Sequence, residues 1–158
     1  AKYFDWERKG LPLRIDIGPK DLLKSAAVMA VRHTSTKQTI DVASNDALVS
    51  TVRGALNSMH DELLAAAKTR LAEHTFPVYS YQQMKDLLVA GETDKSKAGF
   101  YLAAWKCDAT NEAAIKEECK ATIRCYPFDL NQSPPAPGTK CFYTGEQATH
   151  MALFARAF

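Results

Sequence analysis

The side chains best suited to recognise another molecule lie at the start of the chain, where aromatic, acidic and basic residues occur close together. Single-stranded RNA is recognised by stacking bases on aromatic rings and by hydrogen bonds to base edges. Glu7 can accept both the N1 and the N2 hydrogens of guanine, a pairing that no other base offers. It lies one helical turn or two strand steps from Tyr3, on which a base can stack. Arg14, Lys20 and Lys37 are candidates to hold phosphates or the guanine atoms O6 and N7.

The same stretch has a plainer interpretation, in which Phe4 and Trp6 belong to the core and the charges only solubilise the surface. Residues 1–37 hold eight Lys and Arg against four Asp and Glu, while the whole chain carries a net charge of +2. A basic first quarter fits contact with phosphates or an acidic partner, and it is also typical of a solvated face. Spacing alone leaves both interpretations open.

Motifs for catalysis are missing from the sequence. It contains no glycine-rich phosphate loop, no G-x-S-x-G and no H-E-x-x-H, and its histidines at 33, 60, 74 and 150 have no carboxylate or cysteine at a motif spacing. With 46% hydrophobic and 24% charged residues, the composition is that of an ordinary globular protein. We therefore expect no complete catalytic site in this chain.

The cysteines at 107, 119, 125 and 141 lack the C-x-x-C spacing of a zinc ribbon or a redox pair. Without a signal peptide, a disulfide framework is not expected either, and reduced thiols in the cytoplasm are the default. No apolar run approaches the roughly twenty residues that span a bilayer, so no membrane association is expected.

The first elements are predicted from periodicity and turn residues. Leu11, Leu13, Ile15 and Ile17 alternate with polar residues, as in a half-buried strand whose other face carries Arg14 and Asp16. The elements that follow are a helical turn capped by Asp21 over residues 21–24, a strand buried on both faces over 26–32, a polar hairpin loop over 33–37 and a strand over 38–42.

A long helix and a second α/β module are predicted next. From Leu48, apolar side chains recur in steps of three and four to residue 71, on one helical face. The later elements are a strand over 76–79, a helix from a capping box at Ser80 to a stop at Gly91, a strand over 98–105, a helix over 111–120, a strand over 122–128, and a terminal hairpin of residues 140–143 and 151–158.

Residues 3–21 read Tyr-Phe-Asp-Trp-Glu-Arg-Lys-Gly-Leu-Pro-Leu-Arg-Ile-Asp-Ile-Gly-Pro-Lys-Asp. This segment resembles the F-Y-x-W-E-x-K-G-x-P-x-R-x-E-x-G-P-R-D motif of prolyl-tRNA synthetases of the archaeal and eukaryotic-like type, which belong to class II. The resemblance continues through residues 31–37 and 122–128 to the end of the chain. It therefore covers essentially the whole sequence in order.

The resemblance implies an α/β fold with three parts: the latter part of an anticodon-binding domain with a partial mixed sheet (1–45), a long connecting helix (46–73) and a C-terminal α/β domain (74–158). It implies that the anticodon stem-loop of a proline tRNA is the partner. The matching positions for reading its guanines and phosphates are Tyr3, Glu7, Arg14, Lys20 and Lys37, with Lys37 aligned across a one-residue gap.

The resemblance also implies parts that lie outside this chain. The catalytic domain, with its sites for proline and for ATP with Mg²⁺, precedes the matching segment in the family, and so does the first half of the anticodon domain. We expect this chain alone to have no catalytic residue, no cofactor and no ligase activity. The parent enzyme is expected to be a cytoplasmic homodimer, and Phe158 matches the family's terminal aromatic residue without its hydroxyl.

Many relatives hold zinc through four cysteines in the C-terminal domain. The corresponding positions here are Lys106, Asn111, Cys141 and Thr144, so only one thiol is kept. Tetrahedral zinc needs four nitrogen, sulfur or oxygen ligands of suitable type, and we therefore expect no structural zinc. Two further hypotheses remain: a structural or protein-interaction module without useful RNA affinity, and a thiol or metal site built from Cys107 and Cys141.

Overall fold

The structure is a computed structural model and describes residues 2–156. Two compact units divide between Lys68 and Thr69, within a long helix. The α/β class expected from the sequence is confirmed, with one small sheet in each unit. Phe158 lies outside the described residues. Among these residues no helix has both the length and the apolar character needed to cross a bilayer.

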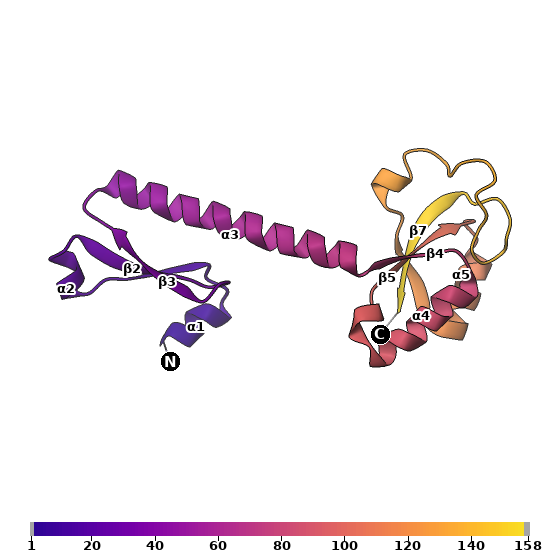
Figure 1. Cartoon of the computed structure of the whole chain (residues 1–158), viewed down its shortest axis with the longest axis horizontal. Coiled ribbons are helices and arrows are strands. Elements are labelled where there is room, and N and C mark those ends of the chain that lie inside the picture. Colours follow the sequence, from indigo (N-terminus) through magenta and orange to yellow (C-terminus); the bar gives the residue numbers. More distant parts are fainter. Residues whose placement is uncertain (1, 157–158) are drawn as a thin grey trace. The chain divides into compact units, whose positions relative to one another are not determined.

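The first unit is a three-stranded sheet flanked by helices (Figure 1). Its elements are α1 (Lys2–Arg8), β1 (Leu13–Asp16), α2 (Pro19–Leu22), β2 (Ala26–Val31), β3 (Thr36–Asp41) and α3 (Asn45–Glu73). The strand order is β1-β2-β3, and both neighbouring pairs are antiparallel. The part of the expected mixed sheet that this chain contributes is therefore antiparallel throughout.

Helix α1 ends in a tight turn that leads directly into β1. Gly10 has a φ of +81°, its N–H donates to the Glu7 carbonyl at 3.0 Å, and the Leu11 N–H donates to the Trp6 carbonyl at 3.2 Å. This pair of bonds defines a Schellman motif, which needs a left-handed residue that glycine adopts without steric cost. The sequence left open whether Tyr3 and Glu7 are one helical turn or two strand steps apart. In the structure they are one helical turn apart, within α1.

Two predicted element boundaries in this unit are wrong. The short helix α2 begins at Pro19 rather than at Asp21, and the Asp21 carboxylate accepts the Gly18 N–H from within the helix at 3.0 Å. Lys37 belongs to β3 and not to the hairpin loop, because the turn closes over residues 32–35. Its side-chain direction is therefore set by the strand.

The core of the first unit lies between one face of the sheet and the first half of α3. Ala27, Met29 and Ile40 are buried there, against Leu48, Val52 and Ala55 of the helix. The prediction that residues 26–32 are buried on both faces is wrong, since the alternate residues Val28 and Ala30 are only half-buried. That half-buried second face is the one that bears the candidate site.

The apolar stripe of α3 is buried along only part of its length. Leu48 and Val52 pack on the sheet, whereas the later stripe positions Leu63 and Leu71 are 46% and 52% exposed. A helix of 29 residues is longer than a sheet of strands with four to six residues can cover. The regular pattern therefore overstates how much of the helix contacts the core.

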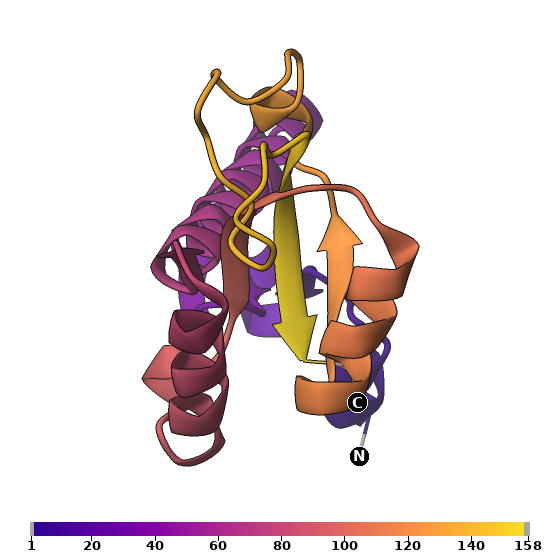
Figure 2. The ribbon, with the colours of Figure 1, turned by 90° about the vertical axis from the view of Figure 1, so that its right-hand side faces the viewer.

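The second unit is a four-stranded mixed sheet with two helices. Its elements are β4 (Thr75–Val78), α4 (Tyr81–Thr93), the 3₁₀ turn η1 (Lys95–Lys97), β5 (Phe100–Trp105), α5 (Ala109–Cys119), β6 (Ala121–Cys125), the 3₁₀ turn η2 (Phe128–Leu130) and β7 (His150–Arg156). The strand order is β4-β5-β7-β6, with β4 and β5 parallel and the other pairs antiparallel. Figure 2 shows β7 in yellow beside the orange β6.

Both helices pack on one face of this sheet. Met84 and Leu88 of α4 and Ile115 of α5 belong to one buried cluster with Trp105 and Phe154. Trp105 and Phe154 meet edge to face with ring centroids 5.5 Å apart, an arrangement that aromatic quadrupoles favour. This cluster is the core of the second unit.

Two predictions in this unit need correction. Gly91 does not stop α4, which continues to Thr93; instead Gly91 is buried, and a Cβ there would lie 3.2 Å from the Ala98 backbone. The terminal segment is not one arm of a hairpin, because β7 pairs with β5 and β6 in the sheet. Lys140 makes only an isolated bridge to Gln147.

Gly99 and Gly54 give opposite predictions for substitution by alanine. A Cβ on Gly99 would lie 2.1 Å from the His74 carbonyl oxygen, which accepts the Phe100 N–H where β5 begins. Gly99→Ala should therefore destabilise the second unit by about 1–3 kcal/mol, as overpacking does. Gly54 lies in α3 with nothing within 4 Å of such a Cβ, so Gly54→Ala should stabilise by about 0.5–1 kcal/mol. Differential scanning calorimetry measures both, and equal effects of the two variants would contradict the argument.

Candidate functional site

The half-buried face of the first sheet carries a row of three residues, one from each strand. Arg14 of β1 is the register partner of Ala30 in β2, and Ala30 is the partner of Lys37 in β3. Residues directly opposite one another point to the same face of a sheet. Neighbouring strands are about 4.8 Å apart, so Arg14 and Lys37 flank the small Ala30 at a separation of roughly 10 Å between their backbones.

Arg14 is in contact with three other side chains of this site. Its terminal nitrogen lies 3.3 Å from the Glu7 carboxylate, and its Nε lies 3.2 Å and 3.3 Å from the two oxygens of Asp16. The guanidinium carbon lies 4.1 Å from the centre of the Tyr3 ring, within the range of a cation–π contact. One guanidinium thus joins α1 to β1.

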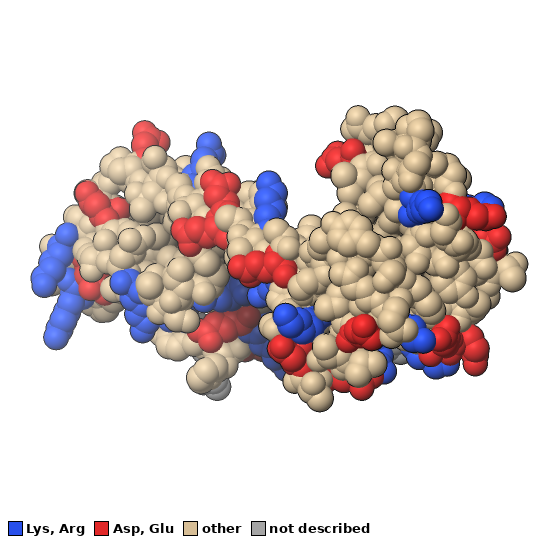
Figure 3. All heavy atoms as spheres, turned by 45° about the vertical axis from the view of Figure 1, so that its right-hand side comes forward, with Lys and Arg blue, Asp and Glu red and all other residues tan. Residues whose placement is uncertain are grey.

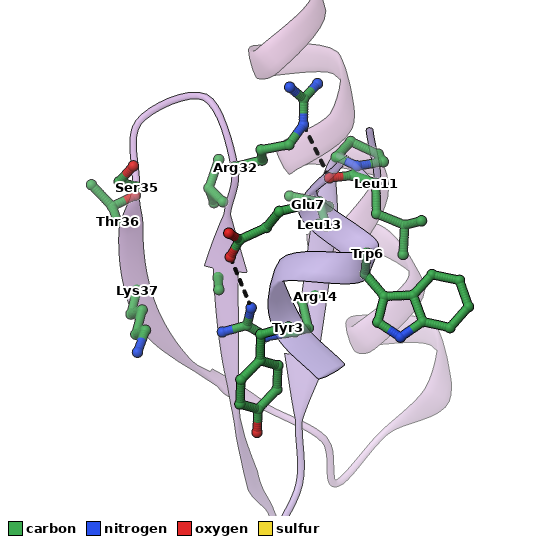
Figure 4. Close-up of a pocket in the computed structure, with 13 residues that line it drawn as sticks. Tyr3, Trp6, Glu7, Leu11, Leu13, Arg14, Arg32, Ser35, Thr36 and Lys37 are labelled. Carbon is green, nitrogen blue, oxygen red and sulfur yellow. Dashed lines mark hydrogen bonds and ion pairs between the residues drawn. The ribbon is translucent and has the colours of Figure 1, made fainter. Parts of the chain in front are cut away.

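A pocket of about 370 Å³ opens between α1 and the hairpin of β2 and β3 (Figure 4). Figure 4 shows Glu7 and Arg14 joined on one side and Thr36 and Lys37 on the other. The residues that line it are Tyr3, Trp6, Glu7, Leu11, Pro12, Leu13, Arg14, Ala30, Val31, Arg32, Ser35, Thr36 and Lys37. Its lining combines apolar and aromatic side chains with charged and hydroxyl groups that could orient a ligand.

A second pocket of about 480 Å³ shares the wall made by α1 and the start of β1. Tyr3, Trp6 and Arg14 line both pockets, while Asp16 and Ile17 line only the second. The stacked pair of Tyr3 and Arg14 therefore stands between two neighbouring hollows.

The structure brings four of the five predicted site residues together. Tyr3, Glu7 and Arg14 are in mutual contact through Arg14, and Lys37 lines the first pocket with them. Lys20 does not join them, because it lies on α2, is exposed and lines neither pocket. Any contact it makes with a ligand at the pockets has to be with a part that extends beyond them.

Two residues of the pocket wall were missed from the sequence. Trp6, considered only as a core residue, is 42% exposed and lines both pockets. Arg32 stands at the start of the hairpin turn, and its Nε donates to the Leu11 carbonyl at 3.1 Å. The available signal for Trp6 was its spacing, three residues after Tyr3 and four before Gly10, which in a helix places it beside both residues. Nothing in the sequence distinguished Arg32.

The hairpin that carries the far wall of the pocket is fastened to α3. His33 Nε2 lies 2.6 Å from a carboxylate oxygen of Glu62, and the other oxygen of Glu62 accepts from Ser58 at 3.0 Å. The hydrogen bond with His33, followed by the one from Ser58, lowers the pKa of the Glu62 carboxyl below its ordinary value. The loop before Lys37 is therefore held by a charge that is present at neutral pH.

Charges of both signs are interspersed on the surface. On the face shown in Figure 3, Asp and Glu lie among Lys and Arg over both units, without a broad area of one sign. Long-range attraction of a polyanion by such a face is weak. Attraction of a nucleic acid to this face has to come mainly from local contacts.

Comparison with known proteins decides the family. A family model described as prolyl-tRNA synthetase, C-terminal, matches residues 92–158. The proline–tRNA ligases of Amoebophilus asiaticus and Chloroflexus aurantiacus are 34% and 33% identical over 157 residues, or 99% of this chain. The chain is homologous to the C-terminal part of prolyl-tRNA synthetases. It spans 29% and 30% of the length of these two curated relatives.

A solved structure supports the same relationship. The prolyl-tRNA synthetase of Cryptosporidium parvum, crystallised with halofuginone and AMPPNP, superposes with a TM-score of 0.79 at 29% identity. The superposition covers 99% of this chain and 30% of that synthetase chain. The resemblance to prolyl-tRNA synthetase seen in the sequence is thereby confirmed, and the α/β fold with it.

The positions that correspond to the zinc ligands of many prolyl-tRNA synthetases do not suit a metal here. The ammonium group of Lys106 forms an ion pair with Glu146, and Asn111 and Thr144 replace two thiols. Among residues 2–156, no group of three or more His, Cys, Asp and Glu side chains is arranged to bind a metal ion. One thiol among an ammonium, an amide and a hydroxyl is not a tetrahedral zinc site.

Cys141 is the thiol that remains. It is buried, which acts to raise its pKa, but hydrogen bonds from Thr144 and from the backbone of Lys106 and Tyr143 outweigh burial and hold the pKa below its ordinary value. Cys107 is exposed and accepts a hydrogen bond from the Tyr126 hydroxyl at 3.8 Å. The proposed pairing of these two cysteines in one site stays a hypothesis.

The Glu62 contact predicts a pH-dependent contribution to stability. Because the pKa of Glu62 is lower in the folded protein than in the unfolded chain, its contribution is present above the ordinary value of 4.5 and is lost as the pH falls through the lowered pKa. Glu62→Gln should therefore lower the melting temperature at about pH 6–7, and the difference from the wild type should close in acid. Asp61→Asn removes the same charge from the adjacent position of α3 as a control. A difference that persists unchanged below the lowered pKa would contradict the role of the carboxylate.

The purified protein should contain no stoichiometric zinc, because three of the four positions lack a suitable ligand. Elemental analysis after dialysis measures this, and a metal content near one zinc per chain would overturn the prediction. The triple substitution Lys106→Cys, Asn111→Cys and Thr144→Cys is the matched control, since it adds three thiols to Cys141. Uptake of zinc by this variant alone is the expected result.

Proposed function

We propose that the face formed by α1 and the first sheet binds the anticodon stem-loop of a proline tRNA, and that it does so by reading guanine. The observation that carries this proposal is the contact of Glu7, Tyr3 and Arg14 at the wall between two pockets. Homology to prolyl-tRNA synthetases supports a tRNA as the partner. The pocket chemistry supports a base, and not only the phosphate backbone, as the group that is read.

Each of the three side chains has a distinct role in this proposal. The Tyr3 ring is 52% exposed and carries Arg14 at its face, so it offers its remaining surface to a stacked base. The Glu7 carboxylate, itself 52% exposed, accepts the N1 and N2 hydrogens of guanine. Arg14 donates to the acceptor atoms of a base or to a phosphate.

The remaining cations surround this centre. Lys37 faces the first pocket from β3, where an ammonium can neutralise a phosphate or donate to guanine O6 and N7. Lys20, outside both pockets, is assigned to the RNA backbone. Trp6 adds a second exposed aromatic surface beside Tyr3, which suits stacking on a neighbouring base.

For the whole protein, we infer an ATP-dependent proline–tRNA ligase of which this chain is the C-terminal part. We assign activation of proline with ATP and Mg²⁺ to a catalytic domain, for which the part of the relatives' length outside the match leaves room. That domain is the second partner of this chain, and the ligase is expected to work as a cytoplasmic homodimer. In this assignment the chain contributes anticodon recognition and no reacting group.

The rival hypothesis is a structural or protein-interaction module that keeps the fold without useful RNA affinity. The interspersed charges on the face shown in Figure 3 are compatible with it, because that face carries no extended cationic area. The two hypotheses differ in what an RNA titration shows. Contact of Arg14, Lys20 and Lys37 with single-stranded phosphates would give a slope of about −2 in a plot of log affinity against log salt.

Glu7→Gln should remove the preference for guanine. We expect the wild-type chain to bind a fluorescent proline anticodon stem-loop about tenfold to a hundredfold more tightly than the same RNA with inosine in place of the anticodon guanines. Inosine lacks the N2 amino group and so loses one hydrogen bond to a charged acceptor. In Glu7→Gln the two affinities should become similar, as measured by fluorescence anisotropy at several salt concentrations.

Asp5→Asn is the matched control, because it removes one negative charge from the same helix, where Asp5 pairs with Arg8 and Lys9 and lines neither pocket. It should keep the preference for guanine. A wild type that binds guanine and inosine RNAs equally would refute base reading by Glu7. Failure to bind either RNA even at low salt would favour the module without RNA affinity.

A further inference from the structure

Asp16 holds one edge of the Arg14 guanidinium. Both carboxylate oxygens of Asp16 approach Arg14 Nε, at 3.2 Å and 3.3 Å, on the edge away from Glu7. The side chains of Arg14 and Asp16 are 22% and 35% exposed, so this pair is shielded more than the contact with the 52%-exposed Glu7. Of the two carboxylates at Arg14, Asp16 is therefore the better anchor.

The strand pairing explains why Asp16 can act as an anchor. Arg14 and Asp16 are two residues apart on the same face of β1, and both are fixed by register partners in β2, Ala30 and Val28. The Asp16 side chain is short and loses little rotamer freedom, whereas an arginine loses up to about 2 kcal/mol of rotamer entropy when it is ordered. Fixing Nε leaves the terminal nitrogens of Arg14 directed toward Glu7 and the pocket.

We infer that Asp16 is a positioning residue for base recognition: it holds Arg14, and through Arg14 it sets the Tyr3 ring and the Glu7 carboxylate. This inference rests on the proposed function. Asp16 has no assigned contact with the RNA itself, and it acts through the guanidinium that touches both other residues. The expected ligand class is a guanine base in single-stranded RNA.

The charge of Asp16 makes the inference open to a sharp test. A carboxylate near an RNA site repels phosphates. If charge were the only effect, removing the negative charge of Asp16 should therefore strengthen RNA binding. A positioning role predicts the opposite for guanine, because a released Arg14 no longer holds Tyr3 and Glu7 in place. The sign of the change thus separates positioning from simple electrostatics.

The experiment compares Asp16→Asn, Asp16→Glu and Asp5→Asn in the full chain. Binding of the guanine and inosine stem-loops is measured by anisotropy, and the Arg14 Nε–Hε signal is followed by NMR in the free protein. We expect Asp16→Asn to reduce the guanine preference about threefold to tenfold, which corresponds to the loss of one or two modest contacts. We also expect it to broaden the Arg14 signal. Asp16→Glu should restore part of both, and Asp5→Asn should change neither.

A second comparison uses an Arg14→Met background, in which Asp16→Asn should cause no further loss of preference if Asp16 acts through Arg14. An equal loss in both backgrounds would overturn the inference, and so would a uniform loss for both RNAs with a matching drop in melting temperature. If the wild type shows no guanine preference, the proposed function fails. An unchanged Arg14 signal in Asp16→Asn refutes the anchoring by itself, whatever the RNA result.

Discussion

The candidate site depends on one guanidinium, that of Arg14, being held between two secondary-structure elements. Helix α1 supplies Glu7 and Tyr3, and β1 supplies Arg14 with Asp16 beside it. A helix of seven residues is too short to be stable by itself in water. The Schellman turn at Gly10 and the contacts of Arg14 place α1 against the sheet. The same contacts therefore order the helix and shape the pocket wall.

The alternation of β1 made much of this site predictable. A period of two placed Arg14 and Asp16 on one face and the apolar residues on the other, and that division does not depend on distant contacts. The resemblance of residues 3–21 then supplied the family, which homology over 99% of the chain supports. The helical state of residues 2–8 stayed open, because their sequence has no strong capping residue and the deciding bonds are made by Gly10 and Leu11 beyond it.

What the sequence could not provide was long-range pairing. Lys37 lines the pocket because β3 begins at Thr36 and Lys37 is the register partner of Ala30. Local composition does not determine this register. In the second unit, residues 151–158 were expected to pair locally with residues 140–143, yet β7 lies between β5 and β6. Gly91 illustrates the same limit: a glycine typical of a helix end is instead required by the close backbone of Ala98.

The ion pair of Lys106 with Glu146 has a consequence for how the second unit persists in a cell. It joins the end of β5 to the loop before β7, where the resemblance implies a metal in other synthetases. Both side chains are exposed, at 40% and 58%, so solvent screens the pair and it contributes little to stability. The stability of the second unit therefore rests on the aromatic core around Trp105 and Phe154, which is built without help from this ion pair.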